Sequence, residues 1–176
     1  MRYAAFMRAL NVGGRVVKMD ELKKIYAKLG FANVESFIAS GNIVFESGAK
    51  DRAALERKIE AALEKALGYP VETFLRDFGQ LATIGAAMPF PGIEDAPTYL
   101  VGFIRKPLDA AARKAFFALS TPNDQFAATG TEVWWHSTIS QADSKFSANA
   151  FDRALKTKST WRNLRTIRRM VDKWGD

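Results

Sequence analysis

Hydrophobic residues alternate between two spacings along residues 1–76. Segments 19–29 and 51–67 carry them three and four positions apart, which predicts two amphipathic helices. Segments 2–9, 34–40, 43–46 and 71–75 are short and rich in β-branched and aromatic residues, which predicts strands. A Gly-Gly loop at 11–18 and a tight Gly41-Asn42 turn connect some of these elements. The order β-α-β-β-α-β is that of a ferredoxin-like unit.

The remaining residues repeat most of this order. We predict a short helix at 77–88, a strand at 98–105, a helix at 109–119, a hairpin of 124–129 with 132–137, and helices at 147–155 and 160–174. The expected fold is α+β, with two ferredoxin-like βαββαβ-type repeats that share a core and a second repeat that ends in helices. Its parts are a first half at 1–76, a connecting helix and Pro-rich linker at 77–96, and a second half at 97–176, packed as one compact unit.

Composition excludes several kinds of site. The 176 residues include no cysteine and one histidine, so a disulfide, a thiolate metal site and a His-rich zinc site are excluded. The carboxylates form no recognisable metal or acid/base pair, and we expect no metal and no cofactor. No apolar run approaches the roughly 20 residues of a membrane span. Arg8 interrupts the apolar N-terminus, and no small-residue cleavage site follows, which predicts a strand there rather than a signal peptide. The absence of cysteine fits a reducing compartment, and we expect a cytoplasmic protein.

Positive charge is concentrated at the C-terminal end. Residues 145–176 contain nine Lys and Arg against three Asp, so they carry six of the seven net positive charges. A basic end on an otherwise balanced chain favours an anionic partner. The alternative is a helix face that is simply solvated.

Polar residues gather where the first strands end. In the Gly-Gly loop, Gly13 and Gly14 allow a ligand to approach the backbone, and Lys18 adds charge. The structural alternative is an ordinary β–α connection, and Ser40 and Asn42 are likewise common hairpin residues. Arg8 needs a partner if it is buried, and Glu46 or Glu35 can provide one in a structural salt bridge.

The last predicted helix is amphipathic. Its apolar side begins at Trp161, and its opposite side carries the cations Arg162, Arg165, Arg168, Arg169 and Lys173. Ser159 or Thr160 can cap its N-terminus, where Arg162 and Asn163 form an anion-binding pattern. The other cations can contact phosphates. The alternative is a docking helix with a wet polar face. In the preceding hairpin, Trp134-Trp135 places one indole on each sheet face, one in the core and one that packs or stacks on a base.

Three separated motifs resemble a known family. Arg8-Ala9-Leu10-Asn11-Val12-Gly13-Gly14 is similar to R-G-I-N-V-G-G, Ser40-Gly41-Asn42-Ile43-Val44-Phe45 to S-G-N-V-V-F, and residues 160–167 to T-x-R-N-W-x-T-V. These are motifs of the bacterial "domain of unknown function 1697" family, whose S-K pair resembles Ser144-Lys145. The resemblance implies a duplicated ferredoxin-like fold and no agreed activity. Ala9 stands where the family usually has glycine, which implies that no unusual backbone angle is required there.

We expect the polar motif residues to converge on one pocket that binds a phosphate, a carboxylate or a similar anion. The ligand-binding candidates are Arg8, Asn11, Gly13, Gly14, Lys18, Ser40, Asn42, Lys145, Arg162 and Asn163. The nucleic-acid-binding candidates are Arg165, Arg168, Arg169 and Lys173. The competing explanation is an internal polar network. Three function classes follow, namely an anion- or nucleic-acid-binding module, an enzyme acting on a phosphorylated or carboxylated substrate, and a ligand-free interaction protein. The sequence assigns no catalytic residue and no oligomeric state.

Overall fold

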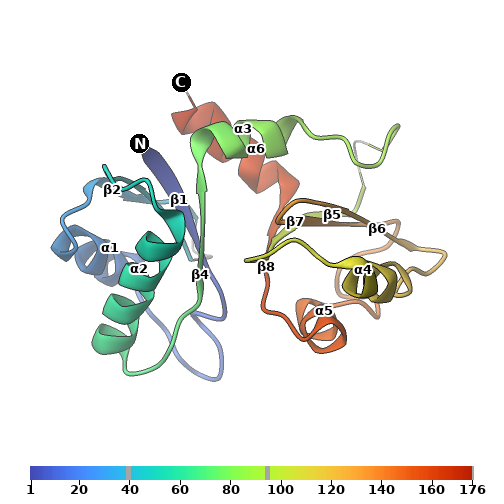
Figure 1. The fold of residues 1–176 in the computed structure, drawn as a ribbon, viewed down its shortest axis with the longest axis horizontal. Helices are drawn as coiled ribbons and strands as arrows, with labels where there is room; N and C mark the ends of the chain where they lie inside the picture. Colours follow the sequence, from blue (N-terminus) through green and yellow to red (C-terminus); the bar gives the residue numbers. More distant parts are fainter. Residues whose placement is uncertain (39–40, 94–95, 176) are drawn as a thin grey trace. The chain divides into compact units, whose positions relative to one another are not determined.

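The computed structural model of the protein describes residues 1–38, 41–93 and 96–175. The chain divides into two compact units. The first comprises Met1–Ala82 and the C-terminal residues from Trp174 onward, and the second comprises Thr83–Lys173. Each unit is built on one four-stranded antiparallel sheet (Figure 1). The prediction of an α+β fold with two repeats is therefore confirmed.

The first unit has the ferredoxin-like element order. It runs β1 (Arg2–Met7), α1 (Met19–Lys28), β2 (Ala32–Ser36), β3 (Asn42–Glu46), α2 (Arg52–Leu67) and β4 (Thr73–Asp77). Its strands lie in the order β2-β3-β1-β4, and every neighbouring pair is antiparallel. Both helices cover the same face of this sheet (Figure 1).

Alternation along the strands builds the first core. Tyr3, Ala5 and Met7 of β1 point to the helix-covered face, where they meet the buried stripes of α1 and α2. The ends of α2 follow the expected rules. The Asp51 carboxylate accepts from Ala54 N–H at 3.0 Å, and Gly68 takes the left-handed C-cap at φ 80°.

Carboxylates of α2 cover the open edge of β4. Glu56 Oε1 accepts from Leu75 N–H at 2.9 Å, and Glu60 Oε1 accepts from Thr73 N–H at 2.8 Å. β4 is an edge strand, so these N–H groups have no strand partner on that side. Glu56 and Glu60 are four residues apart on the helix, a rise of about 6 Å, and Thr73 and Leu75 are two residues apart on the strand, a rise of about 6.8 Å. The two spacings are similar, so each carboxylate reaches one N–H group.

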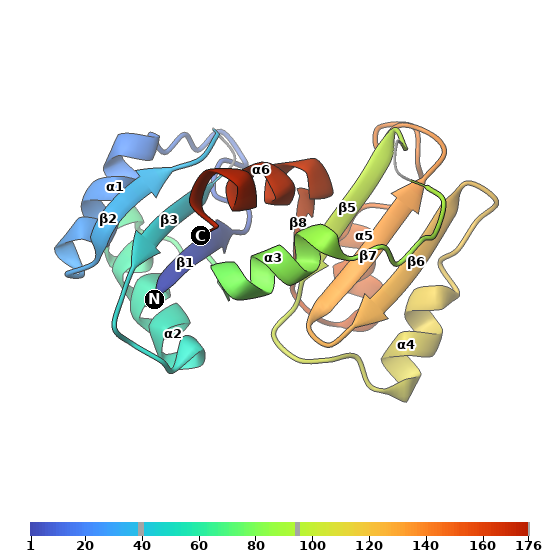
Figure 2. The ribbon, with the colours of Figure 1, turned by 90° about the horizontal axis from the view of Figure 1, so that it is seen from above.

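The second unit repeats this topology. It contains β5 (Thr98–Phe103), α4 (Ala110–Phe117), β6 (Asp124–Thr129), β7 (Glu132–Ser137), α5 (Ala148–Leu155) and β8 (Thr160–Asn163), and α6 (Leu164–Trp174) follows. The strands of the second sheet lie in the order β6-β7-β5-β8 (Figure 2). This order matches that of the first sheet position by position. α3 (Phe78–Ala86) connects the two repeats in sequence.

The helix expected at 160–174 is wrong at its start. Residues 160–163 form β8, which pairs with β5 from Phe103↔Thr160 to Leu100↔Asn163, and the helix begins at Leu164. Trp161 packs in the core of the sheet, where a Cβ on Gly102 would lie 2.8 Å from its indole ring. The predicted helix began about one turn too early because the spacing of Trp161, Leu164 and Ile167 also fits a helix.

No helix in the described part of the chain combines the length and the apolar character that crossing a membrane requires.

Candidate functional site

The Gly-Gly loop follows β1 in the first unit. Gly13 and Gly14 have φ angles of 63° and 80°, and a Cβ at either position would meet nothing within 4 Å. Backbone conformation rather than crowding therefore requires glycine here. Asn11 Oδ1 accepts from Val17 N–H at 2.8 Å and so closes the loop across its own length. Residues 11–16 are all exposed.

Ala9 corrects an implication of the family resemblance. Its φ angle is 52°, in the left-handed region that the family's usual glycine adopts without strain. The unusual backbone angle is thus present even though the glycine is not. The residue before it is held by a backbone bond, because Arg8 N–H donates to the Glu72 carbonyl at 2.8 Å.

Three cations lie in the Gly-Gly loop or next to it in the sequence. Arg8 is partly buried and lies 3.7 Å from the Glu72 carboxylate, a different partner from the expected Glu46 or Glu35. Lys18 is exposed and occupies the N-cap of α1, without a capping bond from its side chain. Arg15 stacks over the ring of Tyr69 at 4.0 Å. Sequence reasoning did not select Arg15, although its position directly after the two glycines was a usable signal.

The β2–β3 hairpin lies beside this loop. Gly41, at φ 71°, accepts from Met7 N–H at 3.0 Å. Asn42 is fully buried and its Nδ2 donates to the Phe37 carbonyl at 3.1 Å, so this amide holds the hairpin. Ser40, another predicted ligand-binding residue, lies outside the described residues.

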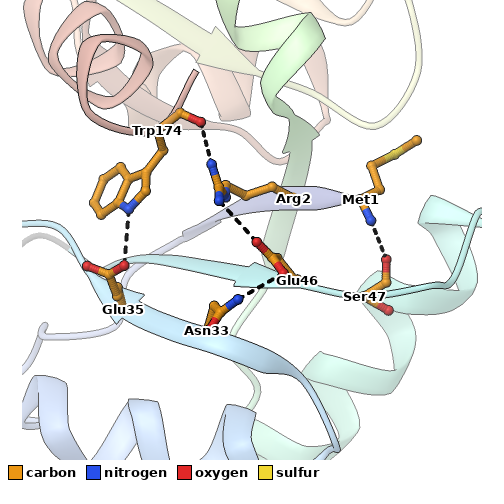
Figure 3. A network of polar contacts seen from close by, with 7 residues as sticks. All are labelled: Met1, Arg2, Asn33, Glu35, Glu46, Ser47 and Trp174. Carbon is orange, nitrogen blue, oxygen red and sulfur yellow. Dashed lines mark hydrogen bonds and ion pairs between the residues drawn. The ribbon is translucent and has the colours of Figure 1, made fainter. Parts of the chain in front are cut away.

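The acids that were expected to pair with Arg8 belong to another network of the first unit (Figure 3). Glu46 pairs with Arg2 at 3.1 Å and accepts from Asn33 at 2.9 Å. These two bonds, that from Asn33 first, lower the pKa of the Glu46 carboxyl. Arg2 also donates to the Trp174 carbonyl at 2.7 Å, and the Trp174 indole donates to Glu35 at 3.1 Å. The network ties Trp174 to the first sheet.

The cationic face of α6 carries all four of the nucleic-acid-binding candidates. We define it as the exposed residues Arg165, Arg168, Arg169 and Lys173. The opposite side of α6 is buried through Leu164, Ile167 and Met170. Arg168 Nε donates to the Gly85 carbonyl at 2.9 Å, which joins α6 to the end of α3.

Arg162 and Asn163 stand at the junction of β8 and α6. Asn163 Oδ1 accepts from Arg165 N–H at 2.8 Å and caps the helix, in place of the expected Ser159 or Thr160. Arg162 donates to Thr160 Oγ1 at 2.8 Å and to the Trp161 carbonyl at 2.9 Å. Burial lowers the pKa of the Arg162 guanidinium to about 10, so it stays charged at neutral pH.

The Ser144-Lys145 motif lies by a buried acid. Ser144 Oγ donates to Asp124 Oδ1 at 2.9 Å, and the Trp135 indole donates to the same oxygen at 2.9 Å. Burial acts to raise the pKa of Asp124, but hydrogen bonds from Trp135, Thr121, Ser144 and Ser137 outweigh it and leave the pKa lowered. This bonded group lies on the helix-covered face of the second sheet, whereas Arg162 extends from the opposite face.

The single histidine packs among aromatic rings. His136 is buried against the rings of Phe90 and Tyr99, and burial lowers its pKa. Across residues 1–38, 41–93 and 96–175, no group of three or more His, Asp and Glu side chains is placed to hold a metal ion. The described candidate residues are thus spread over three places, namely the Gly-Gly loop with its hairpin, the junction of β8 with α6, and the Ser144-Lys145 motif on the other face of the second sheet.

Comparisons with known proteins agree with this fold. The sequence model of a family described as "Protein of unknown function (DUF1697)" matches residues 1–134. Among solved structures, the conserved bacterial protein SP0830 from Streptococcus pneumoniae is similar, with a TM-score of 0.74 and 24% identity over 99% of this chain and 98% of that one. At that identity the likeness shows the fold alone. No curated protein matches the chain.

Proposed function

The chain belongs to the DUF1697 family of proteins of unknown function, and we propose that it binds a polyanion, most simply single-stranded nucleic acid, on the cationic face of α6. The observation that carries this proposal is the arrangement of that helix. Four cations are exposed on one side, while the other side is anchored in the fold by fully or almost fully buried side chains.

Anchoring distinguishes this helix from a detachable amphipathic segment. Leu164, Ile167 and Met170 are 2%, 0% and 0% exposed, so releasing the helix would uncover a complete apolar stripe. Because the helix is already folded and held, its backbone needs no ordering on binding, and its row of cations is suited to a partner with repeated phosphates. Asp172 is the one acid on the exposed side, so the face keeps a net positive charge.

The strength of the electrostatic contribution can be bounded. Each phosphate neutralised on a single strand contributes a slope of about 0.7 to the dependence of log affinity on log salt concentration. Four contacts give a slope of about −3, and affinity should therefore fall roughly 50-fold between 50 and 200 mM salt. A slope near zero would contradict a phosphate-contacting surface.

The test compares matched charge reversals. Binding of a fluorescently labelled single-stranded oligonucleotide is followed by anisotropy at several salt concentrations. Arg165→Glu with Arg169→Glu should abolish binding at 100 mM salt. Lys65→Glu with Lys114→Glu changes the net charge equally at exposed positions of α2 and α4 and should retain most of it. Equal losses in both double variants would mean that net charge alone attracts the ligand, and the proposal would fail.

A second candidate is a small anion at the Gly-Gly loop. Two consecutive exposed glycines at positive φ, with Arg15 and Lys18 beside them, favour it. Asn11→Asp keeps the acceptor for Val17 N–H, so the loop should stay closed, while the new negative charge should weaken anion binding. Thermal shift with nucleotides and sugar phosphates provides the readout, since a ligand at 100 times its Kd adds about 2.7 kcal/mol. No shift in the unmodified protein would reject this candidate.

A further inference from the structure

The Gly-Gly loop of the first unit exposes apolar side chains next to cations. Val16 is 82% exposed and Val12 is 50% exposed, and Val16 is the most exposed large apolar side chain among the described residues. An exposed valine adds little to folding, because most of its surface stays in water. Residues 8–19 contain three cations and no acid. The loop therefore offers apolar surface and positive charge together.

A tight turn brings these two features side by side. Arg15 N–H donates to the Val12 carbonyl at 3.2 Å, and both intervening glycines have positive φ angles, which is the pattern of a type I′ turn. The first and fourth residues of such a turn have Cα atoms less than about 7 Å apart. Val12 therefore lies beside Arg15, and Val16 follows directly in the chain.

The Arg15 guanidinium is held in place. Its central carbon lies 4.0 Å from the centroid of the Tyr69 ring, and the Tyr69 hydroxyl donates to the Leu10 carbonyl at 3.2 Å. Stacking uses the flat face of the guanidinium and leaves the N–H groups at its edge for an acceptor. In the part of the chain that the structure describes, Arg15 has no acidic partner. It is thus a preorganised donor pair for a carboxylate.

The surroundings of the loop leave room for a ligand. A Cβ at Gly13 or Gly14 would meet nothing within 4 Å, so an acceptor can approach the backbone there. Lys18 is exposed and adds a second positive charge. The first acid after the loop, Asp20, pairs with Lys23 at 2.7 Å. One held guanidinium and one lysine suit a single carboxylate better than a polyanion.

The C-terminal residue of a polypeptide has the matching chemistry. It carries a carboxylate, ionised at neutral pH, and a side chain on the same Cα atom. The turn likewise places the Arg15 cation and the two valines within the reach of one residue. A second copy of this loop would bring like charges together, which disfavours self-association through it.

We infer that the Gly-Gly loop receives the C-terminal carboxylate of a partner polypeptide whose last residue is aliphatic. The carboxylate accepts from the Arg15 guanidinium, and the last side chain contacts Val12 and Val16. Capture of a chain terminus by backbone and cationic groups is an established mode of peptide recognition. The inference rests on the small-anion candidate for this loop and names its ligand, and it is independent of the cationic face of α6.

The test uses a fluorescein-labelled hexapeptide, Gly-Ser-Gly-Ser-Thr-Val, with a free C-terminal carboxylate. Its C-terminal amide and a free acid that ends in serine are the comparison peptides. By anisotropy, the valine free acid should bind about tenfold more tightly than its amide, because a hydrogen bond to a charged group is lost in the amide. It should bind about threefold more tightly than the serine peptide, because less apolar surface is buried with serine.

Matched variants locate the two contacts. Arg15→Gln should remove the preference for the free acid, whereas Arg57→Gln, at an exposed position of α2 in the same unit, should keep it. Val12→Ser with Val16→Ser should bring the valine-to-serine ratio close to one and leave the preference for the free acid. Met88→Ser removes an exposed apolar side chain of the second unit and should change neither ratio. Circular dichroism melts check that each variant is folded.

The outcomes separate the proposals. Equal binding of free acid and amide, or a preference for the acid that Arg15→Gln leaves intact, overturns the inference. So does absence of binding at about 1 mM protein, where even a millimolar Kd gives half saturation. A preference for the acid without a preference for valine overturns the peptide assignment and leaves the small-anion candidate standing. Loss of each preference in its own variant only supports the assignment, and oligonucleotide binding tests the face of α6 separately.

Discussion

The carboxylates that cover the edge of β4 allow a sharp prediction. Glu56 is 6% exposed and its Oε1 is the acceptor for Leu75 N–H. Glu56→Ala removes the acceptor and leaves a buried N–H group without a partner. Glu56→Gln keeps a side-chain oxygen of the same reach, so it is the matched control for the shape of the side chain.

The expected magnitude follows from three contributions. A buried backbone N–H that loses its acceptor destabilises the folded state by about 1–3 kcal/mol. Loss of one buried methylene adds about 0.8 kcal/mol. The higher helix propensity of alanine offsets a few tenths of a kcal/mol. We therefore expect Glu56→Ala to lower the free energy of unfolding by about 1.5–3.5 kcal/mol more than Glu56→Gln does.

Two measurements check this difference. Thermal unfolding followed by circular dichroism should show a lower melting temperature for Glu56→Ala, by about 2–4 °C per kcal/mol in a chain of this size. Amide hydrogen exchange at Leu75 should accelerate in Glu56→Ala more than at the core amides of β1, since the loss is local. Equal stability of the two variants, or unchanged exchange at Leu75, would refute the edge-covering role of this carboxylate.

Other predictions concern the backbone, a cap and a buried acid. Ala9→Gly should raise the free energy of unfolding, measured by urea titration, by about 0.5–1 kcal/mol, because glycine adopts the φ angle of 52° without strain. The control Ala61→Gly, in the exposed middle of α2, should lower it by about 1 kcal/mol, because glycine is a poor helix former. Asn163→Ala should lower it by about 0.5–2 kcal/mol through loss of the α6 cap, and Asn163→Ser should restore most of it. The folded-state pKa of Asp124 is below its unfolded value, so its contribution is complete above about pH 4 and is lost as pH falls through the folded pKa. The stability difference between the unmodified protein and Asp124→Asn should therefore shrink from pH 6 to pH 3, and a constant difference would contradict this linkage.

The sequence predicted the architecture because its hydrophobic periods are strong. The helix spacing in 51–67 and the alternation in the β6–β7 hairpin each admit one interpretation, and the observed elements agree with both. The start of α6 was missed for a local reason. Trp161 satisfies both a strand that packs against Gly102 and a helix stripe continued from Leu164. Only pairing with β5 decides between them, and pairing partners are distant in sequence.

The ligand-binding residues were harder to predict than the fold, because one side chain can stabilise the structure with one atom and contact a ligand with another. Asn11 and Asn163 each use an oxygen to accept a backbone N–H, and Asn42 uses its nitrogen to hold a carbonyl. Each motif asparagine therefore has a structural reason to be present, which sequence alone cannot separate from ligand contact. The cations of α6 differ in degree, because exposed charges along one helix face add little to folding, even though Arg168 also donates to the Gly85 carbonyl. For this reason we place the proposed polyanion site on α6, and we test Asn11 by exchanging one amide atom rather than by deleting the side chain.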